Sequence, residues 1–427
     1  MRDDSRPERA DTSAPPVRYE TACRSQIELV PTDLEALLPP GHAARLVWRF
    51  VEGLDLTRFY AAIKACEGGP GRAPIDPKIL IALWLYATID GVGSAREVAR
   101  LCEAHQAYRW IRGGVGVSYH TLSDFRVEHQ AALDDLLTQS IATLRHRGIV
   151  TLARVAQDGT RIRASAGTGS FRRAGTLRDC VREAQRLVER TQRQTDGGLT
   201  RGEAAQQRAA ADRLARVDEA LQALEQVAAV KARHGTRTEP RASTTDPDAR
   251  VMKMADGGFR PGYNVQIATD MDGGAVVGVA VTNDGDDHAS FVPMMRQIQR
   301  RTGGLPAAVV VDAGVNSKAA LTTLAAEAIT VYAPVPARKG VRDVTARCAG
   351  DSEAVAAWRA RMASDEAKAL YRRRGSVAER INADWRRHRG LTQLAVRRLS
   401  KVHTWALWFA LATNALRLMD IVPHRMT

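Results

Sequence analysis

The stretch Leu305-Pro-Ala-Ala-Val-Val-Val-Asp312-Ala-Gly-Val-Asn316 decides the fold of this chain. Its apolar run, residues 307–311, contains alanine and β-branched valine with no polar residue between them. Such a run is typical of a strand buried on both faces, as in the centre of an α/β sheet. Asp312 is therefore expected at the carboxyl end of a central strand, where open α/β sheets bind ligands. Two interpretations of Asp312 stay open: a metal or substrate ligand, and a cap for a helix beginning near Ser317.

The chain around this strand alternates strand and helix patterns, which predicts a mixed α/β region. Apolar segments over residues 262–269 and 275–282 flank the turn Asp272-Gly-Gly274, as in a β-hairpin. An earlier strand or hairpin edge over residues 149–163 carries Asp158 in its middle. The remaining patterns predict, in chain order, a helix over residues 291–300, a helix over 318–326, a strand over 330–334, a polar arginine-rich stretch over 337–362, and helices over 365–388 and 402–419.

The region before residue 149 shows helical patterns. A short helix, a glycine turn and a second short helix that carries Arg126 form the outline of a helix-turn-helix. The alternative for these helices is an ordinary helical bundle. Residues 1–25 are polar and rich in Pro, Asp and Arg, which predicts a disordered leader. We therefore expect a helical domain at residues 26–148, which would bind DNA through the helix-turn-helix, and a second, α/β domain at residues 149–427.

A helical hairpin is expected as an insert within the second domain, at about residues 172–245. Leu177, Val181, Ala184 and Val188 repeat at helical spacing, and a second seam begins at Leu214. Between residues 161 and 193 there are nine arginines and three acidic residues, a net charge of +6. The segment that leads into the insert and forms its first helix is thus strongly basic.

The composition indicates a globular protein with a polyanionic partner. The formal net charge is +14 and the isoelectric point is about 10.0, which favours nucleic acid or an anionic membrane surface. The five cysteines are odd in number and form no C-x-x-C pair, which favours a reduced, cytoplasmic setting without a zinc module. No secretory signal opens the sequence, and the longest apolar run, residues 405–412, is too short to span a bilayer. No G-x-x-x-x-G-K-[ST] loop is present, so no nucleotide cofactor is expected.

Three acidic residues occupy positions that suit metal chemistry: Asp158 in a strand, Asp312 after the buried strand, and Glu379 in a basic helix. Three carboxylates converging from two strands and a helix would hold two divalent cations for phosphoryl transfer. Residues 371–401 contain ten basic and two acidic residues, a net charge of +8 that suits phosphate contacts. Spacing alone does not establish the triad, because the chain has 48 acidic residues.

Two other groups of residues have a structural and a functional interpretation. Asp284, Asp286, Asp287 and His288 could bind a metal, but a polar loop before a helix is favoured. Trp405 and Trp408 could stack on a base, but packing in a helical core is favoured.

Taken as a set, these segments resemble the bacterial insertion-sequence transposases of the DDE type, whose catalytic domain has the ribonuclease H-like fold. The resemblance covers nearly the whole chain. The segments that carry it are Asp158-Gly-Thr-Arg-Ile, Asp246-Pro-Asp-Ala-Arg250, Gly258-Phe-Arg-Pro-Gly-Tyr-Asn-Val-Gln266, Asp312-Ala-Gly-Val-Asn-Ser317 and Tyr371-Arg-Arg-Arg-Gly-Ser-Val-Ala-Glu379.

The resemblance implies that Asp158, Asp312 and Glu379 are the catalytic and metal-binding triad, with two Mg²⁺ or Mn²⁺ ions per site. It also implies that the helix around Glu379 carries the family's Tyr, Arg, Glu, Lys signature. Here four residues, not three, separate Arg374 from Glu379, and Arg386 stands where a Lys is usual. Glu366 and Asp384 are the fallback candidates for the third acid. The expected DNA-binding residues are Arg126, Tyr371, Arg372, Arg373, Arg374 and Arg386.

The sequence therefore predicts an α/β fold, a ribonuclease H-like mixed sheet with a helical insert, preceded by an all-α N-terminal DNA-binding region. The expected function is a DNA transposase that cleaves the ends of its element by hydrolysis and joins the 3′ ends to target DNA. A homodimer in the synaptic complex and a cytoplasmic, nucleoid-associated location are expected, with no membrane partner. The alternative is a DNA-binding regulator with a degenerate, non-catalytic nuclease-like domain.

Overall fold

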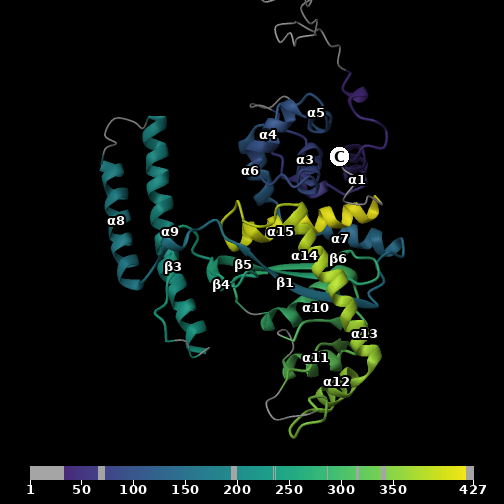
Figure 1. The fold of residues 1–427 in the computed structure, drawn as a ribbon. Helices are drawn as coiled ribbons and strands as arrows, with labels where there is room; N and C mark the ends of the chain where they lie inside the picture. The colour runs from purple at the N-terminus through teal and green to yellow at the C-terminus, as the bar shows by residue number, and fades with distance from the viewer. Residues whose placement is uncertain are drawn as a thin grey trace, which may run out of the picture.

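The computed structural model describes residues 33–65, 73–193, 200–233, 235, 237–285, 287–313, 317–337 and 343–419. The leader expected at residues 1–25 lies outside these ranges. A mixed α/β arrangement occupies the described part, with helices on both sides of one sheet and a helical hairpin beside it (Figure 1). The prediction of a mixed α/β fold is therefore confirmed.

The sheet contains six strands in the order β4-β5-β1-β7-β8, with β6 paired to β5 as well. Strand β1 is antiparallel to β5 and parallel to β7, and β7 is parallel to β8. Strand β4 was not expected, because only Val251 and Met252 are apolar in it. The bounds are β1 Arg154–Arg163, β4 Arg250–Lys253, β5 Phe259–Asp270, β6 Val276–Thr282, β7 Ala308–Val310 and β8 Thr330–Tyr332.

The register of β1 on β7 places two acids on one face of the sheet. Ala156 pairs with Val310 in this parallel ladder. Asp158 and Asp312 each follow their member of that pair by two residues, and side chains alternate between faces with a period of two. The two carboxylates therefore lie on the same face of neighbouring strands.

The helices that follow the hairpin pack along the sheet from β6 to β8. They are α10 Phe291–Thr302, α11 Lys318–Ala326, α12 Glu353–Ala363, α13 Asp365–Arg374, the π-helical turn η4 Gly375–Glu379, α14 Arg380–Ala383 and a second π-helical turn η5 Asp384–His388. Helix α12 corrects the expectation of an irregular stretch over residues 337–362. It buries Val355, Trp358 and Met362, and the Trp358 indole donates to the Ala333 carbonyl at 3.1 Å. Its interspersed arginines hide this apolar face in the sequence.

The N-terminal helices share one apolar core with the sheet through the last helix, α15 Leu399–Leu418. Helix α15 is buried nearly all round and contacts α3, α6, α7 and β6 (Figure 1). The Asn414 side chain crosses this junction, because it donates to the Val276 carbonyl at 2.9 Å and to Ser140 Oγ at 3.1 Å. Trp405 and Trp408 are buried in this core, which confirms the packing interpretation.

The N-terminal helices are η1 Glu35–Leu37, α1 Ala43–Glu52, α2 Thr57–Ala61, α3 Pro77–Ile89, α4 Ala95–Ala104, α5 Gln106–Arg112, α6 Tyr119–Glu128 and α7 Gln130–His146.

The insert is a helical hairpin that stands to one side of the sheet (Figure 1). Helices α8 Ala174–Arg193 and α9 Arg201–Arg233 pack through a small apolar cluster that includes Leu177, Val217 and Leu224. The short antiparallel strands β2 Phe171–Arg172 and β3 Ala242–Ser243 close its base. Among all the described helices, none is long and apolar enough to cross a membrane.

Candidate functional site

The carboxylate of Asp158 is held by two donors from the helix that runs over the sheet. Arg374 Nη2 donates to Oδ1 at 2.7 Å, and Asn382 Nδ2 donates to Oδ2 at 2.8 Å. Arg374 and Asp158 are an ion pair whose side chains are 10% and 20% exposed. Each carboxylate oxygen thus has its own donor, so the orientation of the Asp158 side chain is fixed.

Asp312 lies beside this pair at the exposed end of its strand. Its Oδ1 accepts a hydrogen bond from the Ala313 amide at 2.7 Å and a long one from the Tyr371 hydroxyl at 3.4 Å. Helix α11 is capped by Ser317, whose side chain accepts from the Ala320 amide. The interpretation of Asp312 as the cap of this helix is therefore wrong, and its carboxylate is open to other partners.

The π-helical turn η4 explains how Arg374 and Asn382 reach the same carboxylate. In an uninterrupted α-helix, eight residues turn through about 800°, which leaves the second side chain roughly 80° past the first. A π turn accommodates one additional residue, which rotates later side chains back by about 100°. Arg374 and Asn382 then point in nearly the same direction. The fourth residue between Arg374 and Glu379 is the residue that this π turn accommodates.

Glu379 ends the π turn and is exposed. Its carboxylate folds back over Gly375, where a Cβ atom would lie 3.5 Å from Glu379 Oε1. Within the described ranges, no three His, Cys, Asp or Glu side chains are grouped closely enough to hold a metal ion. The structure thus brings Asp158 and Asp312 together and leaves Glu379 on the same helix as their donors, without a contact to either.

Burial and neighbouring charges act on Asp158 in opposite directions. Burial raises the pKa of Asp158 above its ordinary value, and the negative charges of Asp287 and Asp312 raise it further. The Arg374 guanidinium and the Gly159 amide lower this pKa, but the net direction is upward. A carboxylate in such surroundings is stabilised by any added positive charge.

Asp287 is an acidic neighbour of Asp158 that the sequence pattern favours as part of a polar loop over a metal ligand. It accepts hydrogen bonds from Asn264 Nδ2 at 2.6 Å and from Gln266 Nε2. It also packs over Gly159, where a Cβ atom would lie 2.6 Å from Asp287 Oδ1, so only glycine fits there. Asp287 lies in the expected loop before α10; Asp286 and the His288 side chain are outside the described part of the chain.

The carboxylate oxygens of Asp158 and the amide oxygen of Asn382 are the kind of ligand atoms that a hard divalent cation prefers. Asn382 Oδ1 is buried and has no hydrogen-bond partner among the described residues, so an oxygen atom next to Asp158 is unsatisfied. Mg²⁺ and Mn²⁺ prefer carboxylate and carbonyl oxygens. The residues at this site therefore fit the metal that the sequence implies.

Two arginines expected to bind DNA have structural positions instead. Arg126 is only 5% exposed, and its guanidinium lies over the rings of Trp84 and Trp405 and donates to the Gly93 carbonyl. Burial lowers its pKa to about 10. The prediction that Arg126 contacts DNA is therefore corrected, because its guanidinium is buried in the helical core and contacts groups of that core. Arg374 is likewise turned inward, onto Asp158.

The other expected DNA-binding residues lie on α13 and on the π-helical turn η5. Arg372 and Arg373 are exposed, whereas Tyr371 and Arg386 are half-buried. Of the fallback acids, Asp384 is paired with the buried Arg389 at 2.7 Å, and Glu366 is exposed in the first turn of α13. Asp384 is thus already neutralised by a cation, which leaves Glu366 as the freer of the two.

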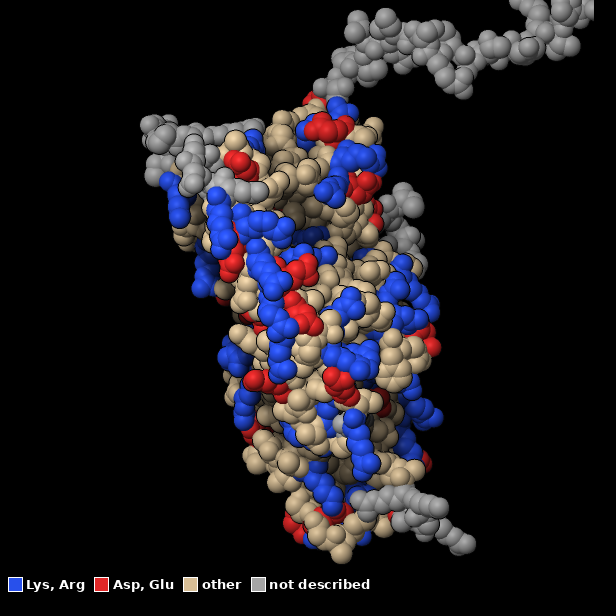
Figure 2. Space-filling view, turned by 90° about the vertical axis from the view of Figure 1, so that its left-hand side faces the viewer, with Lys and Arg blue, Asp and Glu red and all other residues tan. Residues whose placement is uncertain are grey.

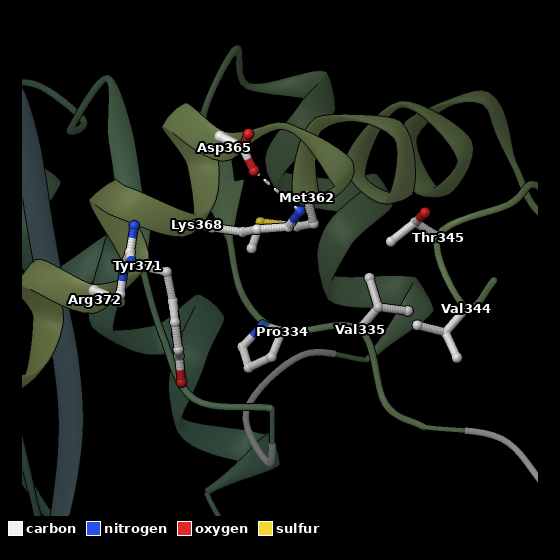
Figure 3. A pocket seen from close by; sticks show the side chains of 9 residues that line it. All are labelled: Pro334, Val335, Val344, Thr345, Met362, Asp365, Lys368, Tyr371 and Arg372. Carbon is white, nitrogen blue, oxygen red and sulfur yellow. Dashed lines mark hydrogen bonds and ion pairs between the residues drawn. The ribbon is translucent and has the colours of Figure 1, made fainter. Parts of the chain in front are cut away.

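A cavity of about 510 Å³ adjoins Tyr371 (Figure 3). Its walls combine the apolar Pro334, Val335 and Met362 with the cationic Lys368 and Arg372. Lys368 is paired there with Asp365 at 3.4 Å. Helix α13, whose Arg374 donates to Asp158, therefore also carries basic side chains that line this cavity.

Two family models match the chain. The model described as "Transposase DDE domain" matches residues 233–415, a range that includes Asp312 and Glu379 and begins after Asp158. The model described as "Transposase domain (DUF772)" matches residues 32–128, the helices from η1 to α6. Neither a curated protein nor a solved structure matches the chain significantly.

Proposed function

This chain belongs to the insertion-sequence DDE transposases, and we propose that it binds the ends of its element, cleaves them by metal-dependent hydrolysis and joins the 3′ ends to target DNA. The observation that carries the proposal is the placement of Asp158 and Asp312 on one face of neighbouring parallel strands. Burial and the negative charges of Asp287 and Asp312 raise the pKa of Asp158, which favours a cation between Asp158 and Asp312.

The proposed metal ligands are Asp158, Asp312 and Glu379, holding two Mg²⁺ or Mn²⁺ ions. When bound, such ions supply activation of the attacking water or 3′-hydroxyl and stabilisation of the leaving oxygen. Glu379 is included because it ends the π turn that aligns Arg374 and Asn382 with Asp158. Its exposed carboxylate has no other partner in the described part of the chain, so its side chain is free to turn toward the strands.

The protein's own side chains orient the acids and the DNA. Arg374 and Asn382 fix both oxygens of Asp158, and the Tyr371 hydroxyl contacts Asp312. Arg372 and Arg373 are exposed on the same helix and are proposed to contact DNA phosphates, together with Arg386. Binding through such contacts weakens as salt rises, because each phosphate contact releases counterions.

The fold and assembly expected for the family remain proposals for this chain. Three antiparallel strands, β6, β5 and β1, continuing into two parallel strands, β7 and β8, support the ribonuclease H-like assignment. We propose that the N-terminal helices select the element's ends through the α5 and α6 pair. A homodimer would bring two ends together in the synaptic complex.

A cleavage assay with matched acid variants tests the proposal. Wild type, Asp158→Asn, Asp312→Asn and Glu379→Gln would each be incubated with DNA bearing the element's ends and Mg²⁺ or Mn²⁺. We expect all four proteins to bind this DNA and the three variants to lose cleavage by roughly 10³-fold or more, as for essential catalytic groups. Full cleavage by Asp158→Asn or Asp312→Asn would overturn the assignment.

Glu366→Gln is the matched control, because it neutralises an exposed acid of the adjoining helix α13. Its cleavage rate should equal that of wild type. A loss of cleavage in Glu366→Gln with an active Glu379→Gln would move the third acid to Glu366.

The alternative function, a DNA-binding regulator without catalysis, is favoured by one observation: the described residues contain no group of three acids close enough to hold a metal. The same assay distinguishes the two functions. A regulator would bind the element's ends in all variants and cleave in none, wild type included.

A further inference from the structure

The first helix of the insert has two chemically opposite faces. Its apolar side chains, Leu177, Val181, Ala184 and Val188, recur every three or four residues and face α9. Arg178, Arg182, Arg186, Arg190 and Arg193 are all exposed. At about 100° per residue, these five arginines centre on the side of the helix opposite the apolar seam. We name these five residues the α8 arginine face.

The acidic side chains of α8 are each matched by a basic neighbour. Asp179 pairs with Arg182, and Glu189 lies 3.9 Å from Arg193. Glu183 pairs with Arg213 of α9 at 3.2 Å. Within the described ranges, Arg178, Arg186 and Arg190 have no ion-pair partner, so three uncompensated positive charges remain on one face.

Those three charges form a row along the outside of the molecule. At about 1.5 Å per residue, Arg178 and Arg190 are separated by roughly 18 Å along the helix axis. A duplex presents one phosphate charge per about 1.7 Å of its axis, so a length of that order offers roughly ten phosphates. Figure 2, which views the side of the molecule that carries the hairpin, shows Lys and Arg side chains in a long band with fewer acidic ones among them.

We propose that the α8 arginine face is a second DNA-binding surface, which grips the phosphate backbone of a duplex without reading its sequence. Arginine side chains without aromatic or apolar partners on the same face suit phosphate contacts rather than base recognition. The surface lies on the insert, whereas Arg372 and Arg373 lie on α13 at the candidate catalytic site. It therefore extends the DNA path beyond that site, and it rests on the proposed function only in taking DNA as the partner.

The test compares two triple variants that remove the same charge from the same hairpin. Arg178→Gln/Arg186→Gln/Arg190→Gln changes the α8 arginine face. Arg201→Gln/Arg208→Gln/Arg233→Gln changes three exposed arginines of α9. Neither touches the apolar seam, and equal unfolding temperatures would show that both variants fold. Affinity for a duplex of arbitrary sequence would be measured across a salt series with the full chain.

Each phosphate contact contributes about 0.9 to the slope of log affinity against log salt concentration. We expect the α8 triple variant to lower that slope by about 2.7 and the α9 triple variant to change it by less than about 1. An unchanged slope in the α8 variant, or an equal loss in both variants, would overturn the inference. If the partner of the α8 arginine face were an acidic protein, the slope for duplex binding would be unchanged in the α8 variant.

Failure of the proposed function gives a different result. A wild-type protein that binds the duplex but never cleaves the element's ends would contradict the proposed cleavage function. The slopes of log affinity against log salt concentration would still test whether α8 binds DNA. A wild-type protein that cleaves normally, with no change of slope in the α8 variant, would sink only the inference on α8.

Discussion

Asn382 is the residue whose importance emerges only from the three-dimensional arrangement. Its amide nitrogen donates to Asp158 Oδ2 at 2.8 Å, while its own carbonyl oxygen is buried without a partner in the described part of the chain. Nothing in its sequence surroundings marks an asparagine on a basic helix as a site residue. The hydrogen bond from its amide makes Asn382 a positioning residue for the Asp158 carboxylate.

The variant Asn382→Ala should slow end cleavage by about 10- to 100-fold, because a hydrogen bond to a charged group contributes roughly 1.5–3 kcal/mol. Binding of the element's ends should be unchanged, since the amide faces the sheet. The measurement is the cleavage rate at saturating DNA, beside the DNA dissociation constant.

Asn283→Ala is the control for Asn382→Ala. The Asn283 amide donates to the Asp248 carbonyl at 2.9 Å, a bond of similar length to a neutral acceptor. Equal loss of cleavage in both variants would show that Asn382 acts only through general stability.

At the scale of elements, the π turn η4 gives the helix over the sheet its function. It shifts the phase of the helix so that side chains eight residues apart reach one carboxylate. A single π turn within a helix is uncommon and often occurs at functional sites. On the proposed assignment of the Tyr, Arg and Glu signature, the additional residue between Arg374 and Glu379 lies in this π turn.

Deletion of Gly375 tests this account of the π turn. It restores three residues between Arg374 and Glu379, and the turn should revert to α-helix. Asn382 would then rotate by about 100° away from Asp158. We expect cleavage to fall at least as far as in Asn382→Ala, with the helix content by circular dichroism unchanged. A deletion variant that cleaves as well as wild type would show that the signature spacing, and not the π turn, places the side chains.

At the scale of the whole molecule, helix α15 makes the N-terminal helices and the sheet one cooperative unit. Its buried face continues a single apolar core from the first helices to the sheet, and Asn414 joins β6 to α7. The division of the chain into a DNA-binding and a catalytic part is therefore not a division of its core. The hairpin α8–α9 has its own small cluster and stands apart from that core.

The variant Trp408→Ala should lower the free energy of unfolding by about 3–5 kcal/mol, as for other buried large-to-small changes. Trp408 is fully buried, and its indole donates to the Arg126 carbonyl at 3.0 Å, which links α15 to α6. Denaturant unfolding followed by probes in the N-terminal helices and in the sheet should show coincident transitions.

Phe259→Ala is the control for Trp408→Ala, because this large side chain is 67% exposed. It should change the free energy of unfolding by less than about 0.5 kcal/mol. Two separate transitions in wild type would contradict the single cooperative unit.

The sequence by itself determined the elements and the sheet positions of two acids. Alternation and helical spacing encode local structure, so β7, α10, α11 and α15 occur where their patterns predict them. A strand pattern ending on Asp312 and another containing Asp158 were enough to place Asp158 within a strand and Asp312 just after one. Helix α12 and strand β4 were missed because charged residues interrupt their apolar positions.

Only the tertiary structure decided which side chains meet. Arg374 and Asp158 are 216 residues apart, and no local pattern records such a contact. Arg126 shows the same limit, since a basic residue on a short helix looks exposed until two tryptophans, one of them from α15, enclose it. Periodicity specifies the face of an element, whereas the partner of that face depends on how the elements pack.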